Sequence, residues 1–290
     1  MEVQWSLIGF TLFVALGAGL FALQGILAVL GKGAKLQLPA LITAFIAIVV
    51  GGVFSFTHLQ HWDRAFNGFG NITSGITQEL IGIVVVVVVM LVYLVLLRKG
   101  ELPKWAGIMA AIAGLALVIV MTTSYLMPAR PVWATPALYL FYMAQAFVAG
   151  GAALWLAGSA VKADDSQLIA ARLTAIGGVL VIVSIVAYAA YISTVQFAEV
   201  GNYFDPTHPT KAMTDPSAYI TQLISGDLAL YFWGALIVGG VIPALLGLLK
   251  WSKAEGGLPC AAVALIAALA GGAAFRVALY VLGGSVFIFY

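Results

Sequence analysis

Eight apolar runs of about 20 residues or more constrain the fold of this sequence more than any other feature. The hydrocarbon core of a bilayer is about 30 Å thick, and a helix of about 20 apolar residues crosses it. The predicted spans are residues 5–30, 37–57, 77–97, 104–126, 134–160, 168–196, 226–250 and 258–289. The run Val84–Val89 lacks the alternation of a lipid-facing strand, which favours helices. We therefore expect an all-α fold, a polytopic membrane protein with eight transmembrane helices in one domain, residues 1–290.

Composition supports a membrane protein and excludes several other classes. Of the 290 residues, 63% are hydrophobic, and no soluble domain of this length could bury so many. A net charge of +2 gives no indication of nucleic-acid binding. The amino terminus lacks a positive segment and a small-residue cleavage site, so the first run is predicted to be retained as a helix. The single cysteine, Cys260, excludes an internal disulfide and any iron–sulfur cluster ligated by this chain alone.

Basic residues separate the connections between runs into two sets. Four alternate links, beginning with the first, carry nine basic residues: Lys32, Lys35, Arg98, Lys99, Lys104, Lys162, Arg172, Lys250 and Lys253. The other three links carry Arg64, Arg130 and Lys211. Because short cytoplasmic loops are enriched in Lys and Arg, the first set is predicted to face the cytoplasm. An even number of spans then places both termini on the outer side.

The stretch between the second and third runs concentrates ionisable residues beside the bilayer. It contains His58, His61, Asp63, Arg64 and Glu79, in a chain where 8% of residues are charged. Such groups are costly to keep next to the hydrocarbon, so a functional site is the default hypothesis for them. Arg64 has an equally good alternative role as an anchor for lipid phosphates.

Other membrane-level charges are predicted to share the outer side with this stretch. Asp227 begins the seventh run from outside, and Arg276 lies 18 residues after Leu258 in the eighth. A buried guanidinium requires a partner, and Glu79 or Asp227 is the expected counter-ion. Both acids could instead stabilise helix starts through the helix dipole.

The helix-start interpretation identifies a capping residue for each of these acids. Thr77 would cap the third helix and Ser225 the seventh, with Glu79 and Asp227 in the first turns. Glu79 differs from Asp227 because its helix continues directly into Ile81, Gly82 and six valines, at the apolar boundary. This position makes Glu79 a candidate proton acceptor.

The histidines argue against bound haem. They are His58, His61 and His208, two of them one turn apart and the third in a proline-bracketed loop. Facing helices therefore do not carry the histidine pairs that two stacked b haems need. A metal held by His58, His61 and Asp63 would lack a fourth ligand.

Quinol oxidation suits an imidazole and a carboxyl group near one membrane surface. A quinol releases two electrons and two protons, and its two hydroxyl groups need acceptors at opposite ends of a flat apolar slot. The proposed acceptors are His58 and Glu79, because histidine titrates near neutral pH. His61, Arg64 and Arg276 are further candidates for quinol binding. Glu79 and Asp227 are candidates for a proton path.

The layout and one motif resemble a known family. Eight helices with both termini outside, and the pattern H-L-x-x-x-x-R-A-F followed by a Glu, are similar to the membrane anchor subunit of dimethyl sulfoxide reductase. The pattern lies at His58, Leu59, Arg64, Ala65, Phe66 and Glu79. The resemblance implies that His58 and Glu79 form the quinol site, and the additional His61 leaves open which imidazole contacts the quinol.

The resemblance also implies cofactors, partners and location. Menaquinol would be the bound substrate, with no haem or iron–sulfur cluster in this chain. Electrons would pass to a four-cluster, ferredoxin-like iron–sulfur subunit and then to a molybdopterin catalytic subunit, both docked outside. The location would be the cytoplasmic membrane of a bacterium or archaeon. The terminal acceptor stays open among dimethyl sulfoxide, another S- or N-oxide, and an oxyanion.

Two further functions compete with quinol oxidation. A proton-coupled secondary transporter would use the buried charges along a substrate path, although the inner halves of the predicted helices carry no charge beyond the basic residues at their cytoplasmic ends. A purely structural membrane anchor would need none of these residues for chemistry.

Overall fold

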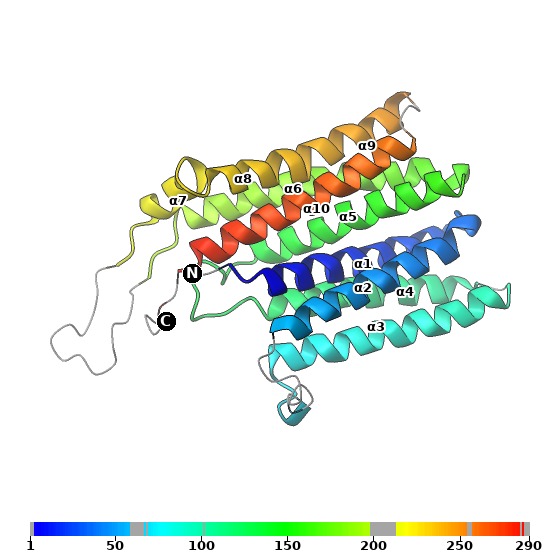
Figure 1. Cartoon of the computed structure of the whole chain (residues 1–290), viewed down its shortest axis with the longest axis horizontal. Coiled ribbons are helices and arrows are strands. Elements are labelled where there is room, and N and C mark those ends of the chain that lie inside the picture. The colour runs from blue at the N-terminus through cyan, green and yellow to red at the C-terminus, as the bar shows by residue number, and fades with distance from the viewer. Residues whose placement is uncertain are drawn as a thin grey trace.

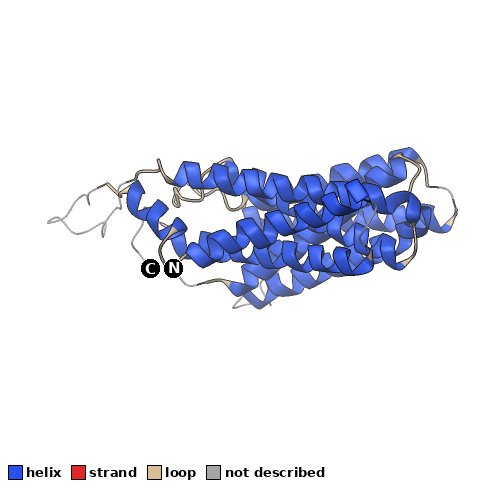
Figure 2. Cartoon of the chain, turned by 90° about the horizontal axis from the view of Figure 1, so that it is seen from above, coloured by secondary structure: helices blue, strands red, loops and turns tan. Residues whose placement is uncertain are grey.

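The structure, a computed structural model, is a bundle of long helices (Figure 1). It describes residues 3–58, 67, 69–100, 102–197, 213–253, 257–284 and 286, without the side chains of His58 and Lys253. Within these residues eight helical segments are long and apolar enough to cross a membrane, which confirms the predicted fold class. Figure 2 shows the bundle from above, with helices as its regular elements. Helices satisfy their backbone hydrogen bonds internally, as a hydrocarbon environment requires.

The helices follow the chain in a simple order. The elements are α1 (Trp5–Val29), η1 (Ala34–Leu36), α2 (Gln37–His58), α3 (Gly75–Arg98), α4 (Lys104–Thr123), α5 (Ala137–Ala160), α6 (Asp164–Ile192), α7 (Pro216–Ile224), α8 (Ala229–Leu236), η3 (Ile237–Val241), α9 (Ile242–Lys253) and α10 (Leu258–Leu282). The seventh span combines α8, the π-helical η3 and α9. The start of α1 and the end of α10 lie at the same end of the bundle (Figure 1).

The connection before the seventh span contains a short helix that the sequence analysis did not predict. Asp215 caps α7 by accepting a hydrogen bond from the backbone N–H of Ser217, and Pro216 occupies the first helical position. The pair Asp215-Pro216 therefore starts a helix. The capping role expected for Ser225 is wrong, because Ser225 ends α7.

The last helix is shorter than predicted. It ends at Leu282 and not at residue 289, because Gly283 and Gly284 follow directly. Glycine is a poor helix former and is common just beyond helix ends. The early end brings the carbonyl group of Gly283 within reach of the connection between α4 and α5.

The core of the bundle forms around α1, and α3 lies at the edge. In the most apolar window of each helix, 78% of residues are buried in α1 and 17% in α3. Close packing of α1 on α5 depends on Gly19 and Gly150, because a Cβ atom at Gly150 would lie 2.5 Å from the carbonyl carbon of Gly19. Since α3 has few buried residues, most of its surface is available to lipid.

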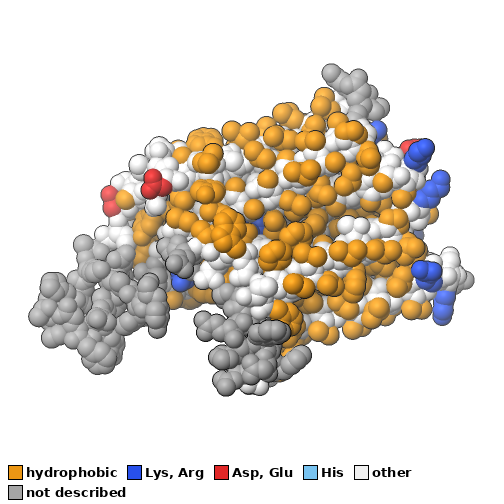
Figure 3. Space-filling view, viewed as in Figure 1, with side chains coloured by type: hydrophobic (Ala, Val, Ile, Leu, Met, Phe, Trp, Pro, Cys, Tyr) orange, Lys and Arg blue, Asp and Glu red, His pale blue; other side chains and the backbone are white. Residues whose placement is uncertain are grey.

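Charge is distributed unevenly over the bundle. Figure 3 shows most of the visible Lys and Arg side chains at the end opposite the start of α1. Apolar side chains cover the surface between the two ends in this view. This pattern is the one expected for a protein that crosses a bilayer.

Candidate functional site

Glu79 lies on the inward-facing stripe of α3. The buried residues of this helix are Thr77, Glu79, Val86, Met90 and Tyr93, and the last four recur at helical spacing. Glu79 therefore occupies a position of the helix that faces the bundle, and its side chain is 8% exposed.

The start of α3 differs from the prediction. The helix begins at Gly75 after Ser74, so Glu79 lies beyond the first turn and Thr77 is inside the helix. The expected capping role of Thr77 is wrong. Glu79 is therefore buried against neighbouring helices and lies outside the first turn, where the helix dipole would stabilise its charge.

Ser124 is the polar neighbour of the Glu79 carboxyl group. Its hydroxyl group lies beside the Glu79 carboxyl group and comes from the end of α4. Gly75 permits this approach, because a Cβ atom at Gly75 would lie 2.7 Å from the Ser124 Oγ atom. Two helix ends therefore meet at Glu79 because one of them carries a glycine.

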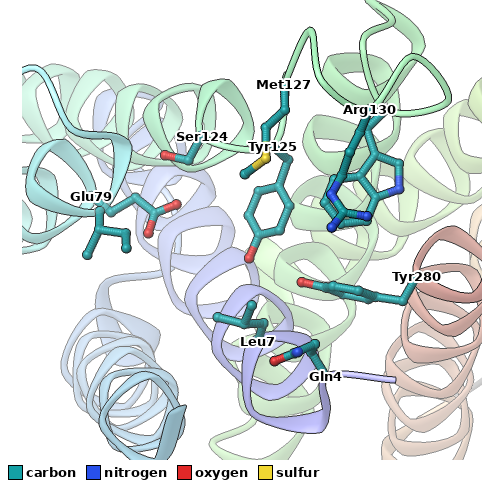
Figure 4. A pocket seen from close by; sticks show the side chains of 10 residues that line it. Gln4, Leu7, Glu79, Ser124, Tyr125, Met127, Arg130 and Tyr280 are labelled. Atoms are coloured by element: carbon teal, nitrogen blue, oxygen red, sulfur yellow. The ribbon is translucent and has the colours of Figure 1, made fainter. Parts of the chain in front are cut away.

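Two cavities meet at Glu79. The first, here called the chamber, has a volume of about 320 Å³. It is lined by Gln4, Leu7, Ile76, Glu79, Ser124, Tyr125, Met127, Arg130, Trp133 and Tyr280 (Figure 4). In that view Tyr125 stands between Glu79 on one side and Arg130 and Tyr280 on the other.

The second cavity, here called the slot, has a volume of about 170 Å³. It is lined by Phe10, Gly52, Ser55, Phe56, Ile76, Glu79, Leu80 and Ile83, which belong to α1, α2 and α3. Phe56 and Ile76 are 50% and 66% exposed, so the slot reaches the lipid-facing surface. Ser55 and Glu79 supply the polar groups of its lining.

Aromatic rings and one cation form the wall of the chamber opposite Glu79. The Trp133 indole donates to the carbonyl oxygen of Leu279 at 2.9 Å and packs edge-on against the ring of Tyr280. Arg130 donates to the carbonyl oxygen of Gly283 at 3.0 Å, with its guanidinium carbon 4.8 Å from the centre of the Trp133 ring. These contacts join the α4–α5 connection to the end of α10.

Arg276 is fully buried near this wall, and its expected counter-ion is absent within the part of the chain that the structure describes. Its Nε donates to the Thr11 hydroxyl at 2.8 Å, and its terminal nitrogens donate to the carbonyl oxygens of Gly272 and Thr11 at 2.9 and 3.3 Å. Its guanidinium carbon lies 4.7 Å from the centre of the Tyr142 ring. Neutral oxygens and an aromatic face therefore surround the charge. The expectation that Glu79 or Asp227 pairs with Arg276 is wrong for these residues.

The remaining candidates lie elsewhere or outside the described residues. Asp227 is exposed in the turn between α7 and α8 and lines neither cavity. His58 ends α2, close in sequence to Ser55 and Phe56 of the slot, and its side chain is outside the description. His61 and Arg64 lie outside the described residues, as do Asp63 and His208.

The structure adds site residues that sequence reasoning did not select. Ser124 and Tyr125 lie on the Glu79 side of the chamber, and Arg130 and Tyr280 lie across it. Arg130 belongs to the proline-rich segment Met127–Pro136, which also contributes Met127 and Trp133 to the chamber. No sequence signal brought it next to Glu79, which lies on another helix.

No group of three potential metal ligands occurs among the residues described. The metal alternative through His58, His61 and Asp63 falls on residues whose side chains the structure leaves undescribed. The site that can be built from described side chains is therefore one carboxyl group shared by two cavities, the slot and the chamber.

Comparison with known proteins adds one family. The sequence model of the family described as DMSO reductase anchor subunit (DmsC) matches residues 1–282. No curated protein sequence matches the chain. The family match covers all eight membrane spans.

Proposed function

Because the chain belongs to the family of DMSO reductase anchor subunits, we propose that it binds menaquinol beside Glu79 and oxidises it. Membership makes the chain the membrane anchor of an oxidoreductase complex that also has catalytic and iron–sulfur subunits. The electrons of the quinol would leave to the iron–sulfur subunit, with its four clusters, and continue to a molybdopterin catalytic subunit. The clusters and the molybdopterin would belong to these partners.

The observation that carries the proposal is the position of Glu79 at the end of an apolar slot that reaches the lipid. A flat quinone ring with an isoprenoid tail is apolar, so the slot between α2 and α3 suits its chemistry. Glu79 is the ionisable group among the described residues that line this slot. A carboxylate in such a place serves as a proton acceptor when a quinol hydroxyl group approaches it.

The reaction needs a second proton acceptor. Oxidation of one quinol yields one quinone, two protons and two electrons. We assign one proton to the Glu79 carboxylate and the other to the imidazole of His58, at the end of the helix that carries Ser55 and Phe56. His61 and Arg64 remain candidate contacts for the quinol.

Arg276 and Asp227 have supporting roles in this proposal. Arg276 lines neither cavity, but it binds Thr11 on the same helix that contributes Leu7 to the chamber and Phe10 to the slot. Arg276 would therefore hold α1 in place beside the quinol. Asp227 would take part in proton transfer at the same end of the protein.

The proposed location is the cytoplasmic membrane of a bacterium or archaeon, with the quinol site near the outer surface. The end of the bundle rich in Lys and Arg would face the cytoplasm (Figure 3). Both termini and the partner subunits would then lie outside. A chain that carries no redox group needs a quinol close to the cluster of its partner, and a shallow site meets that need.

Replacement of Glu79 with Gln in the assembled complex tests the function. Gln keeps the shape of the side chain and cannot accept the proton, so quinol-dependent turnover is expected to fall about 100-fold or more. Activity with an artificial reductant that donates directly to the partner subunits should stay unchanged. Asp164→Asn makes the same chemical change at the opposite end of the bundle and serves as the control.

Two outcomes would replace the proposal. Normal quinol-dependent turnover of the Glu79→Gln complex would leave the chain as a structural anchor. Accumulation of a solute by the chain alone in liposomes would favour the secondary transporter.

A further inference from the structure

The chamber on the other side of Glu79 differs chemically from the slot. Besides Glu79, it is lined by the polar side chains of Gln4, Ser124, Tyr125, Arg130 and Tyr280. The slot has Ser55 as its only other polar side chain among the described residues. One carboxyl group is therefore in contact with a slot that suits a quinol and with a chamber whose wall offers several polar groups to water.

An incompletely hydrogen-bonded hydroxyl group lies in the wall of this chamber. The Tyr280 side chain is 2% exposed, and its hydroxyl group makes no hydrogen bond of good geometry to the described residues. Figure 4 shows the hydroxyl groups of Tyr125 and Tyr280 pointing toward one another across the chamber. Buried hydroxyl groups are almost always hydrogen-bonded, to protein or to ordered water. A water molecule in the chamber beside this pair would give the Tyr280 hydroxyl group a further partner.

The chamber has room for a chain of water molecules. Its volume is about 320 Å³, whereas one water molecule occupies about 30 Å³ in the liquid. Its wall includes Met127, which is 40% exposed, so the chamber reaches the surface at the end of the bundle where α1 begins. Water in this space would connect the Glu79 carboxyl group to the aqueous phase.

A fixed cation lies on the far side of the chamber. Arg130 is held by the carbonyl oxygen of Gly283 and by the ring of Trp133. Its guanidinium group completes the polar part of the chamber wall opposite Glu79. The order along the chamber is thus a carboxyl group, hydroxyl groups and a guanidinium group.

We propose that the chamber is the hydrated outlet for the proton that Glu79 accepts from the quinol. This inference rests on the quinol oxidation proposed above and extends it to the residues that carry the proton away. The bond from the quinol oxygen to hydrogen breaks, the carboxyl group holds the proton, and water next to Ser124 and Tyr125 receives it. Glu79 is then ionised again for the next quinol, and the electrons leave separately to the iron–sulfur subunit. Ser124, Tyr125 and Tyr280 order the water and act as positioning residues.

The experiment compares hydroxyl groups inside and outside the chamber. Tyr125→Phe and Tyr280→Phe, singly and together, remove hydroxyl groups from the chamber and keep the rings. Tyr93→Phe is the control, because it also removes a buried hydroxyl group, one that donates to Gln37 at 2.7 Å and lines neither cavity. Each complex is reconstituted in liposomes, and menaquinol-dependent turnover is measured in H₂O and in D₂O.

Slower proton release should appear in a specific combination of readouts. In the Tyr125→Phe/Tyr280→Phe complex we expect turnover to fall about tenfold and the solvent isotope effect to rise, with the KM for quinol unchanged. The Tyr93→Phe complex should behave as the unsubstituted one. Leu7→Trp, which fills the chamber with an apolar ring, should reproduce the slow turnover and keeps the test available if the double variant does not assemble.

The outlet and the quinol site can fail separately. Unchanged turnover and an unchanged isotope effect in the chamber variants, with an inactive Glu79→Gln complex, would overturn the outlet and leave the quinol site standing. An active Glu79→Gln complex would overturn the quinol site, and the outlet with it.

Discussion

Arg276 is a buried charge that neutral groups stabilise. Within the described chain its hydrogen bonds go to the hydroxyl and carbonyl oxygens of Thr11 and to the carbonyl oxygen of Gly272. Each of these groups keeps another hydrogen-bond partner when Arg276 is removed. The Thr11 hydroxyl donates to the carbonyl oxygen of Leu7, and the Gly272 carbonyl lies inside a helix. The geometry of the planar guanidinium group, which reaches three acceptors and two ring faces, is therefore what makes the charge tolerable.

A comparison of Arg276→Lys with Arg276→Met tests this account. Lys keeps a buried charge but offers a single ammonium group, so we expect a loss of about 3 kcal/mol in the free energy of unfolding. Met removes the charge and leaves no acceptor that needs it, so the expected loss is about 1 kcal/mol. Thermal unfolding of the purified chain in detergent measures both. A greater loss for Met than for Lys would contradict the account.

At the scale of elements, a glycine allows the start of α3 to contact the end of α4. Gly75 lies at the first position of α3, and Ser124 follows the last residue of α4. The two helix ends touch because Gly75 has no side chain, and this contact places the Ser124 hydroxyl at Glu79. The carboxyl group therefore depends on the packing of two helices as well as on its own helix.

Gly75→Ala should separate catalysis from stability. The added Cβ would lie 2.7 Å from the Ser124 Oγ atom, so Ser124 must move away. Alanine is the better helix former by about 1 kcal/mol, which offsets the cost of that movement. We expect little change in thermal stability and a fall of about tenfold in quinol-dependent turnover.

The control for that prediction is Gly70→Ala. A Cβ atom at Gly70 meets no atom of the described residues within 4 Å, and Gly70 lines neither cavity. Turnover of this variant should stay at the level of the unsubstituted complex. Equal turnover of both variants would show that the approach of Ser124 does not matter to Glu79.

At the scale of the whole molecule, sequence reasoning predicts the membrane spans well and only part of the candidate site around Glu79. Length and apolar composition predict eight transmembrane helices, and the position of Glu79 beside a run of valines marks it as a site candidate. The chamber could not be predicted. Its walls come from α1, α3, the α4–α5 connection and α10, which lie far apart in the sequence.

The physical reason is that these helices are apolar on nearly every side. Soluble helices reveal their buried face by an alternation of polar and apolar residues, whereas lipid and protein interior select the same residues. The inward face of α3, with Glu79, Val86 and Met90, is thus hidden among exposed valines such as Val84 and Val88. The counter-ion expected for Arg276 failed for the same reason, since depth in the membrane does not specify which helix faces which.

The orientation of the whole molecule decides whether the proposed outlet releases protons outside. In a Cys260→Ser background the chain has no other cysteine, so single cysteines can mark each end. Ser193 follows α6 at the end where α1 begins, and Ser252 lies near the end of α9 at the opposite end; both are exposed. A membrane-impermeant maleimide added to intact cells or spheroplasts should label Ser193→Cys at once and Ser252→Cys only after permeabilisation, because Lys and Arg favour cytoplasmic loops. The reverse pattern would place the chamber on the cytoplasmic side, where a proton released from Glu79 would not leave the cell.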